Sequence, residues 1–295
     1  RQAFENAVVG SMAMGGSTNA IIHLLALSRR AGATVTLDEF DALSAKTPVL
    51  ANIRPSGDTY LMEDFFYAGG LRALLVEVRD LLHLDCLTVS GKTLGEGIDG
   101  ATSYNSDVIR QRANPVSAEG SLAVLKGNLA PGGAVMKPAA ADPKFHRHTG
   151  PALVFDSYPE IKKACEDPDL DVTQDTVLIL RKAGPIGGPG MPEWGMLPLP
   201  IKLVKQGVRD MVRLSDARMS GTSYGACVLH CAPEAFIGGP LALVETGDLI
   251  SIDVERRSIH LHVSDEDRAV RRAAWVAPKP RFERGLAGWW PNTLS

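Results

Sequence analysis

The sequence predicts an α/β protein, with a helical part up to about residue 114 and a mixed, β-rich domain over residues 115–295. Two observations predict this organisation. Apolar residues recur at helical spacing through much of the first hundred residues. Beyond residue 120, short aliphatic runs bounded by Gly, Pro and Asp dominate, and these are typical of strands. The composition changes between Arg112 and Gly120.

Three segments of the first part carry helix signals. Residues 20–31 place apolar side chains on one face and arginines near the end, and Gly32 is typical of a helix stop. Thr36–Glu39 has the form of a capping box, which predicts a helix after it. A third apolar stripe runs from Leu71 to Leu82, and the preceding Gly69–Gly70 pair indicates a turn.

Strand-like runs and two helical stretches fill the second part. Helices are expected near Glu160 and over residues 265–275. The residues Glu255–Ser258 lie between two runs of alternating polarity, which predicts a β-hairpin. The predicted strands span residues 122–125, 134–136, 152–155, 176–180, 211–214, 249–254 and 259–263.

Bulk composition narrows the function classes. The formal net charge is −3 and no basic block occurs, so no nucleic-acid partner is expected. No apolar run reaches the roughly 18 residues that a membrane span needs. The opening RQAFENAVVG is no signal peptide and reads as the interior of a helix, so we expect residues before Arg1 to be missing. Four scattered cysteines fit a reduced, cytoplasmic setting better than a disulfide scaffold.

The first of three Gly-rich segments is Met14–Asn19, between two helical patterns. The glycines free the backbone, and the following helix offers unpaired N–H groups that favour an anion. Ser17, Thr18 and Asn19 could add hydroxyl and amide contacts to a ligand. The alternative is a plain helix cap, because these residue types cap helices well.

The second segment, Gly184–Glu193, follows a predicted strand and holds four glycines and three prolines. Such a rigid path with unusual dihedrals is costly unless it holds something in place. Glu193 is the one carboxylate of the segment, and a hard cation takes oxygen ligands of this kind. A surface loop with a solvated Glu193 is the alternative.

The third segment, Ser215–Gly225, is a hydroxyl-rich turn that also follows a predicted strand. Ser220 precedes a glycine, and a serine becomes a base or nucleophile only beside a cation or a partner base. No G-x-S-x-G pattern surrounds it, so the hydrolase elbow does not apply. The alternative for Ser220 is an N-cap. Cys227 and Cys231 are expected to be buried thiols, and His230 a satisfied core histidine or one that supports a neighbouring site residue.

Taken together, these segments resemble the dihydroxy-acid dehydratase and 6-phosphogluconate dehydratase family. The resemblance extends to about Trp275, and the amino-acid sequence of these segments is most similar to the sugar-acid branch, such as arabonate and xylonate dehydratases. The matching blocks, in the family's order, are MAMGGSTNAIIHLLAL, YLMEDFFYAGGL, GNLAPGGAVMK, GPIGGPGMPE, SDARMSGTSYG and PEAFIGGPLALVETGDLISID.

The resemblance implies both the fold and the site. Residues 1–114 would be the C-terminal, mostly helical part of an N-terminal α/β domain, and residues 115–295 a β-barrel-like (swivelling β/α) domain. Glu193 matches a Mg²⁺ ligand, and Ser220 matches the serine taken to be the catalytic base. Thr222 would contact substrate, and the Ser17-Thr18-Asn19 loop would border the site.

The resemblance also implies what is missing. The family's 2Fe-2S ligands and other Mg²⁺ ligands lie upstream of the matched part, so this chain alone is not expected to assemble the cluster. The tail ERGLAGWWPNTLS departs from the usual family ending.

The implied activity is that of a hydro-lyase. It would convert a 2,3-dihydroxy sugar acid to a 2-keto-3-deoxy acid, with Mg²⁺ and a 2Fe-2S cluster in a cytoplasmic homodimer or tetramer. The alternatives are a branched-chain dihydroxy-acid dehydratase, and an inert or partner-binding fragment.

Overall fold

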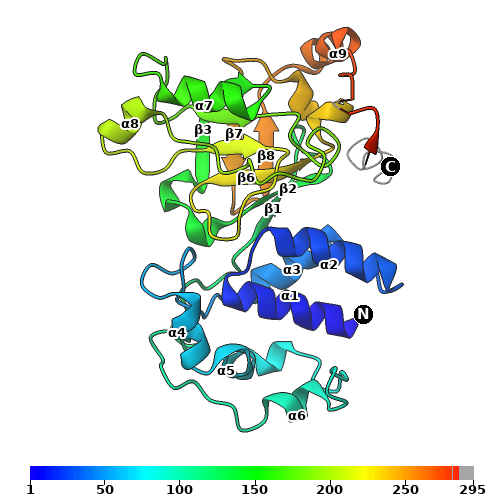
Figure 1. The fold of residues 1–295 in the computed structure, drawn as a ribbon, viewed down its shortest axis with the longest axis vertical. Helices are drawn as coiled ribbons and strands as arrows, with labels where there is room; N and C mark the ends of the chain where they lie inside the picture. Colours follow the sequence, from blue (N-terminus) through cyan, green and yellow to red (C-terminus); the bar gives the residue numbers. More distant parts are fainter. Residues whose placement is uncertain (281, 286–295) are drawn as a thin grey trace. The chain divides into compact units, whose positions relative to one another are not determined.

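A computed structural model describes residues 1–280 and 282–285, so most of the divergent tail lies outside the described residues. The chain divides into two compact units, Arg1–Ala123 and Val124–Ser295. The first is helical and the second is built on a sheet (Figure 1). No helix of the described residues has both the length and the apolar character that crossing a bilayer requires.

Helices make up the first unit. Helix α1 packs against α2, α3 and α5, and its apolar side chains enter the core of the unit (Figure 1). The predicted capping box is confirmed, because Thr36 Oγ1 accepts a hydrogen bond from the Glu39 N–H and the Glu39 carboxylate accepts one from the Thr36 N–H. The α-helices are α1 (Gln2–Met14), α2 (Asn19–Arg30), α3 (Leu37–Lys46), α4 (Met62–Tyr67), α5 (Gly70–Glu77) and α6 (Leu94–Ile98).

The helix predicted from Leu71 to Leu82 is shorter than its apolar stripe. Helix α5 ends at Glu77, and a 3-10 turn over Arg79–Leu81 follows it. The predicted turn before it is confirmed, since Gly69 has φ +114°. A side chain at Gly69 would also meet the Thr102 carbonyl oxygen at 2.7 Å, so only glycine fits there.

The second unit contains an eight-stranded sheet of order β1-β2-β6-β5-β4-β3-β7-β8. The four central strands, β6, β5, β4 and β3, pair in parallel in that order. The outer strands pair antiparallel: β2 with β6, β7 with β3, and β8 with β7. The strands are β1 (Ala123–Leu125), β2 (Gly133–Met136), β3 (Arg147–Phe155), β4 (Val177–Leu180), β5 (Arg213–Ser215), β6 (Cys227–Ala232), β7 (Leu249–Asp253) and β8 (Ser258–Leu261).

The two ends of this sheet meet. Lys126, just after β1, forms a bridge with Ser258 at the start of β8. The Lys126 N–H donates to the Arg257 carbonyl at 2.9 Å, and the Ile259 N–H donates to the Lys126 carbonyl at 3.0 Å. A side chain at Gly127 would lie 1.8 Å from the Ile259 carbonyl oxygen, so the approach requires glycine. The sheet is therefore barrel-like, and the predicted fold class is confirmed.

One strand was absent from the sequence prediction. Residues 227–232 form β6, which lies between β2 and β5 and is almost wholly buried. Each of the seven predicted runs overlaps one of the other strands, although β3 begins earlier, at Arg147. The predicted hairpin is confirmed, because β7 and β8 pair antiparallel with Asp253 opposite Ser258.

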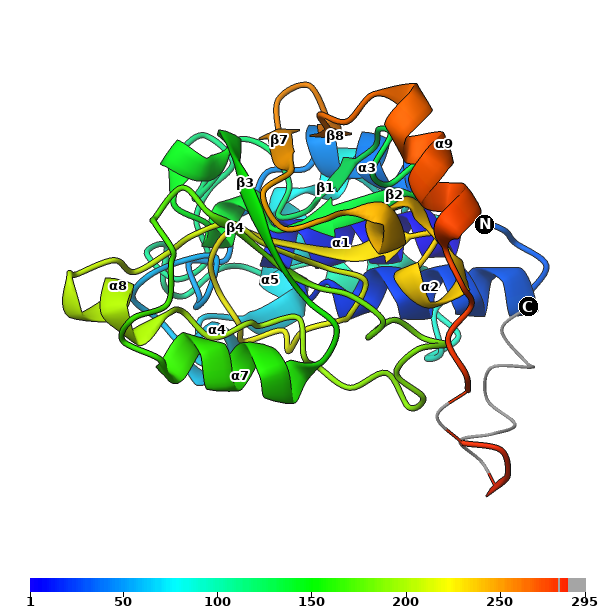
Figure 2. The same ribbon diagram turned by 90° about the horizontal axis from the view of Figure 1, so that it is seen from above.

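The described residues of the second unit also form three α-helices. Helices α7 (Tyr158–Glu166) and α8 (Ile201–Lys205) pack together, and α7 also contacts β3. Helix α9 (Asp265–Ala274) lies on another side of the strands (Figure 2). Ser157 caps α7 by accepting the Glu160 N–H, and Ser264 caps α9 by accepting the Asp267 N–H.

Candidate functional site

Two Gly-rich loops of the second unit start side by side. The parallel strands β4 and β5 pair with Leu180 opposite Ser215, the last residue of each strand. Since the carboxyl ends of parallel strands meet at one edge of a sheet, the loops that follow begin at that edge. The first loop carries Glu193, and the second carries Ser220.

Glu193 and the Ser220 loop are held together by Arg218. Arg218 Nη2 donates to Glu193 Oε1 at 3.2 Å, and the Glu193 side chain remains 40% exposed. The Gly195 N–H also donates to the Arg218 carbonyl at 2.7 Å. Glu193 is thus an exposed carboxylate that is paired with a residue two positions before Ser220, and its role as a metal ligand stays a prediction.

Ser220 lies in a turn. Its Oγ is 3.1 Å from Thr222 Oγ1, so the two predicted site hydroxyls form a hydrogen-bonded pair. The next regular element is strand β6 rather than a helix, so the N-cap alternative for Ser220 is wrong. Ser220 is half-buried and Thr222 is exposed, which leaves this hydroxyl pair open to a ligand.

Two buried carboxylates anchor the Gly-rich loop. Asp216 accepts the backbone N–H groups of Lys182, Ala183 and Ala235 at 2.9–3.1 Å. Burial raises the pKa of Asp216 above its usual range, against the effect of those hydrogen bonds. Neither this residue nor Glu234 was singled out from the sequence, although Asp216 directly follows a strand and Glu234 follows a cis proline.

Glu234 binds the backbone of the Gly184–Glu193 loop a few residues further along the chain. Its carboxylate accepts the Ile186 N–H at 2.9 Å and the Gly187 N–H at 3.3 Å. A side chain at Gly184 would lie 1.9 Å from Glu234 Oε2, so this glycine is required for the close approach. Burial, reinforced by the negative charge of Asp216, raises the pKa of Glu234 to about 7.

Glu234 should make stability depend on pH. An unfolded Glu has a pKa near 4.5, so between pH 4.5 and 7 the native state binds more protons and stability falls as pH rises. Glu234→Gln removes this titration. The difference in unfolding free energy, wild type minus Glu234→Gln, is expected to decrease from pH 5 to pH 7.5 in urea titrations. The control is Glu160→Gln, an exposed carboxylate that accepts the Asp156 N–H. A pH-independent difference for Glu234→Gln would contradict the assignment.

The CxxxC segment lies on β6. Cys227 and Cys231 are fully buried thiols, as expected, and burial raises the pKa of both. The expectation of a satisfied His230 is wrong, because its Nε2 is buried without a hydrogen-bond partner. Burial and the nearby Arg218 charge lower the pKa of His230 to about 4, so the ring is neutral at pH 7.

The Ser17-Thr18-Asn19 loop lies in the first unit, between α1 and α2. Ser17 Oγ accepts the Asn19 N–H at 3.2 Å. Thr18 is the N-cap of α2, but its side chain makes no cap hydrogen bond. Thr18 Oγ1 is buried without a partner among the described residues, so the helix-cap alternative does not account for this hydroxyl. The role of the loop at the site stays a prediction.

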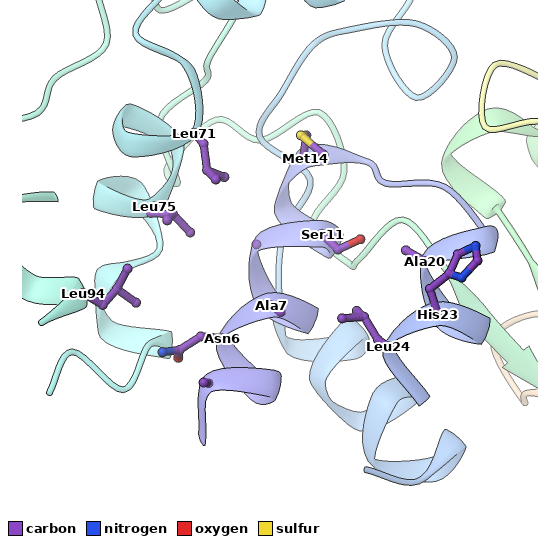
Figure 3. A pocket seen from close by; sticks show the side chains of 12 residues that line it. Asn6, Ala7, Ser11, Met14, Ala20, His23, Leu24, Leu71, Leu75 and Leu94 are labelled. Carbon is purple, nitrogen blue, oxygen red and sulfur yellow. The ribbon is translucent and has the colours of Figure 1, made fainter. Parts of the chain in front are cut away.

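The first unit also holds an apolar groove of about 530 Å³ (Figure 3). Helix α1 forms its middle, with Leu71, Leu75 and Leu94 on one side and Leu24 on the other. His23 is its one titratable lining residue. The groove contains none of the predicted site residues and has little polar chemistry to offer a sugar acid.

Metal ligands are sparse. The part of the chain that the structure describes contains no group of three or more His, Cys, Asp or Glu side chains placed to hold a metal ion. All four cysteines are free thiols, and Cys86 lies in a different unit from the others. These residues do not fit a 2Fe-2S cluster, which is held by four protein ligands. Glu193 fits a magnesium ion only as one ligand of a larger set.

Family models match both parts of the chain. The N-terminal model of the dihydroxy-acid/6-phosphogluconate dehydratases matches residues 1–97, and their C-terminal model matches residues 107–293. The chain belongs to this family. The second match reaches residue 293, beyond Trp275, the expected end of the resemblance.

Similar dehydratases carry three kinds of name. A 6-deoxy-6-sulfo-D-gluconate dehydratase of Pseudomonas putida is 54% identical over 285 residues, which cover 96% of this chain and 49% of that protein. An L-arabinonate dehydratase of Rhizobium leguminosarum bv. trifolii is 48% identical, over 93% of this chain and 48% of that protein. A dihydroxy-acid dehydratase of Rippkaea orientalis is 45% identical, over 100% and 52% respectively. The chain spans about half the length of the curated relatives it matches.

Proposed function

We propose that this chain is the part of a sugar-acid dehydratase that contains the catalytic base. Such an enzyme is a hydro-lyase that turns a 2,3-dihydroxy acid into a 2-keto-3-deoxy acid. The contact between the Glu193 loop and the Ser220 loop through Arg218 carries the proposal. It brings one carboxylate, one cation and a hydroxyl pair to a single edge of the barrel-like sheet. The sugar-acid names of the relatives at 54% and 48% identity favour that branch of the family.

Ser220 is the proposed base. Its hydroxyl must lose a proton before it can act, and positive charge close by favours the alkoxide. The Arg218 guanidinium, two residues away in the chain, is proposed to supply this charge, and it donates a hydrogen bond to Glu193. The alkoxide then takes the proton from C2, and the bond from C3 to its hydroxyl breaks. The departing hydroxide takes up the proton from Ser220 and is released as water, which restores the alkoxide, and the resulting enol tautomerises to the 2-keto acid.

The remaining polar groups have positioning roles in this proposal. Thr222, whose hydroxyl is hydrogen-bonded to that of Ser220, orients the Ser220 oxygen and contacts the substrate. Glu193 provides one carboxylate oxygen to Mg²⁺. When bound, that ion supplies positive charge for the substrate carboxylate and C2 hydroxyl. Ser17, Thr18 and Asn19 are proposed to border the substrate.

An assay of the complete protein tests the activity. We expect it, loaded with Mg²⁺ and a 2Fe-2S cluster, to release a 2-keto acid from arabonate, xylonate or 6-deoxy-6-sulfogluconate. Dihydroxyisovalerate is the comparison substrate, because the relative at 45% identity is named a dihydroxy-acid dehydratase. A kcat/KM that is highest for dihydroxyisovalerate would move the protein to the branched-chain class. No turnover of any of the four acids would refute the dehydratase proposal.

A second candidate is an inert domain that pairs with a separate partner. This candidate is favoured for the 295-residue chain by itself, because its described residues contain no complete set of metal ligands. A cluster absorbance band in the purified chain alone would refute this candidate. For the complete enzyme we propose a cytoplasmic homodimer or tetramer acting on a small-molecule acid, which light scattering would test.

A further inference from the structure

Arg213 is a fully buried cation in the middle of the second unit. It lies on β5, and its side chain has no exposed surface. A buried charge is costly unless it is paired and hydrogen-bonded. Arg213 meets that requirement through Asp210, whose Oδ1 lies 2.9 Å from Arg213 Nη2. Burying the guanidinium has a desolvation cost, so we ask which other groups Arg213 holds in place.

Two of those groups are backbone carbonyls near Glu193 and Ser220. In addition, Arg213 Nε donates to the Met211 carbonyl at 3.3 Å, and Nη1 lies 3.3 Å from Met196 Sδ. Arg213 Nη1 donates to the Leu197 carbonyl at 3.2 Å, and Nη2 donates to the Tyr224 carbonyl at 3.1 Å. Leu197 is four residues after Glu193, and Tyr224 is four residues after Ser220. One planar guanidinium therefore joins the segment that carries the carboxylate to the turn that carries the proposed base.

Asp210 extends the same connection. Its carboxylate accepts the Ala226 N–H at 3.0 Å, which closes the far end of the Ser220 turn. It also accepts the Asp142 N–H at 3.0 Å and the Met211 N–H at 2.9 Å. The Arg213–Asp210 pair thus fixes both loops to the strands beneath them.

Gly225 shows how closely the turn passes over this pair. Its φ is +96°, and a side chain there would lie 1.9 Å from Arg213 Nη2 and 2.4 Å from Asp210 Oδ1. Only glycine permits this path. The turn is therefore shaped around the guanidinium.

We infer that Arg213 is a positioning residue that sets the distance between the Glu193 carboxylate and the Ser220 hydroxyl. This inference rests on the proposed function, because it assigns Arg213 a role in that site. The geometry needs arginine rather than lysine, since a lysine ammonium is a compact point charge and lacks the planar fork that serves Leu197, Tyr224 and Asp210 together.

The test is Arg213→Lys in the complete, cofactor-loaded protein. A misplacement of about 1 Å costs roughly 100-fold in rate, so we expect kcat to fall by 10- to 100-fold with a smaller change in KM. We also expect weaker binding of Mn²⁺, used in place of Mg²⁺ and followed by electron paramagnetic resonance without substrate. Faster amide exchange is expected in peptides covering residues 192–199 and 220–227.

Arg271→Lys is the matched control. Arg271 bonds the Asp248 carboxylate and the Leu243 carbonyl, but it lies on α9, outside both site loops. If Arg213→Lys and Arg271→Lys lose activity only in proportion to their loss of melting temperature, the inference is overturned. Unchanged Mn²⁺ binding and unchanged exchange in Arg213→Lys also overturn it.

A second variant covers the case in which Arg213→Lys does not fold. Asp210→Asn keeps the shape of the pair and removes its negative charge, and the same three readouts are expected to change in the same direction. If they do not, the inference fails. A wild-type protein that dehydrates none of the four acids refutes the proposed function instead, and the Mn²⁺ and exchange readouts then judge the loop geometry separately.

Discussion

Replacing Ser220 by Ala is expected to lower kcat by about 100- to 10,000-fold, the range in which removing a general base acts. The substitution removes the only atom proposed to take the C2 proton. The hydroxyl makes one side-chain hydrogen bond, to Thr222, so little else should change. Substrate affinity should therefore change much less than kcat, because the proton transfer occurs only in the transition state.

Ser251→Ala is the matched control for Ser220→Ala. Ser251 lies on β7, and its hydroxyl is likewise hydrogen-bonded to a threonine, with Thr149 Oγ1 at 2.7 Å, and also to His262 Nε2 at 2.6 Å. We expect full activity from this variant. Steady-state kinetics on the best sugar acid and thermal melts of both variants decide the matter. A Ser220→Ala enzyme within tenfold of wild-type kcat would show that another group takes the proton.

Much of the fold follows from local sequence signals. The capping box at Thr36–Glu39 satisfies its own backbone donors, and the hairpin at Glu255–Ser258 joins two alternating runs. Both signals act between near neighbours in the chain, which is why sequence alone identifies them. The roles of Glu193 and Ser220, in contrast, come from the family resemblance and stay predictions, although the Gly195 N–H bond to the Arg218 carbonyl joins their two loops.

Other features depend on contacts between distant residues. Strand β6 was missed because its sequence CVLHCA is mostly apolar and does not alternate in polarity. The segment forms a strand by pairing with β2, which lies far from it in the chain, and with β5. Arg213 looks like an ordinary charged residue in a short run. Its burial against Asp210, and its bonds to Leu197 and Tyr224, appear only once the chain is folded.

Glu193→Gln should lower the affinity of the complete enzyme for Mg²⁺ by at least about 10- to 100-fold. Mutation of a residue that only hydrogen-bonds a metal ligand already costs that much, and Glu193 is proposed to bind the ion directly. Gln keeps the shape of Glu193 and the bond to Arg218 through its carbonyl oxygen, but it removes the negative charge that a hard cation prefers. Because the ion pair with Arg218 is partly exposed, its loss should cost only about 0–1 kcal/mol of stability. A large loss of Mg²⁺ affinity with little change in melting temperature is therefore the expected result.

Glu245→Gln separates a metal ligand from an ordinary surface ion pair. Glu245 lies 3.2 Å from Arg271, the same separation as Glu193 from Arg218, and its side chain is 67% exposed. We expect this control to keep wild-type activity at every Mg²⁺ concentration, whereas Glu193→Gln should recover part of its activity as Mg²⁺ is raised. If the two variants respond alike, Glu193 serves only to hold Arg218. The charge proposed to favour the Ser220 alkoxide would then come from the Arg218 guanidinium alone.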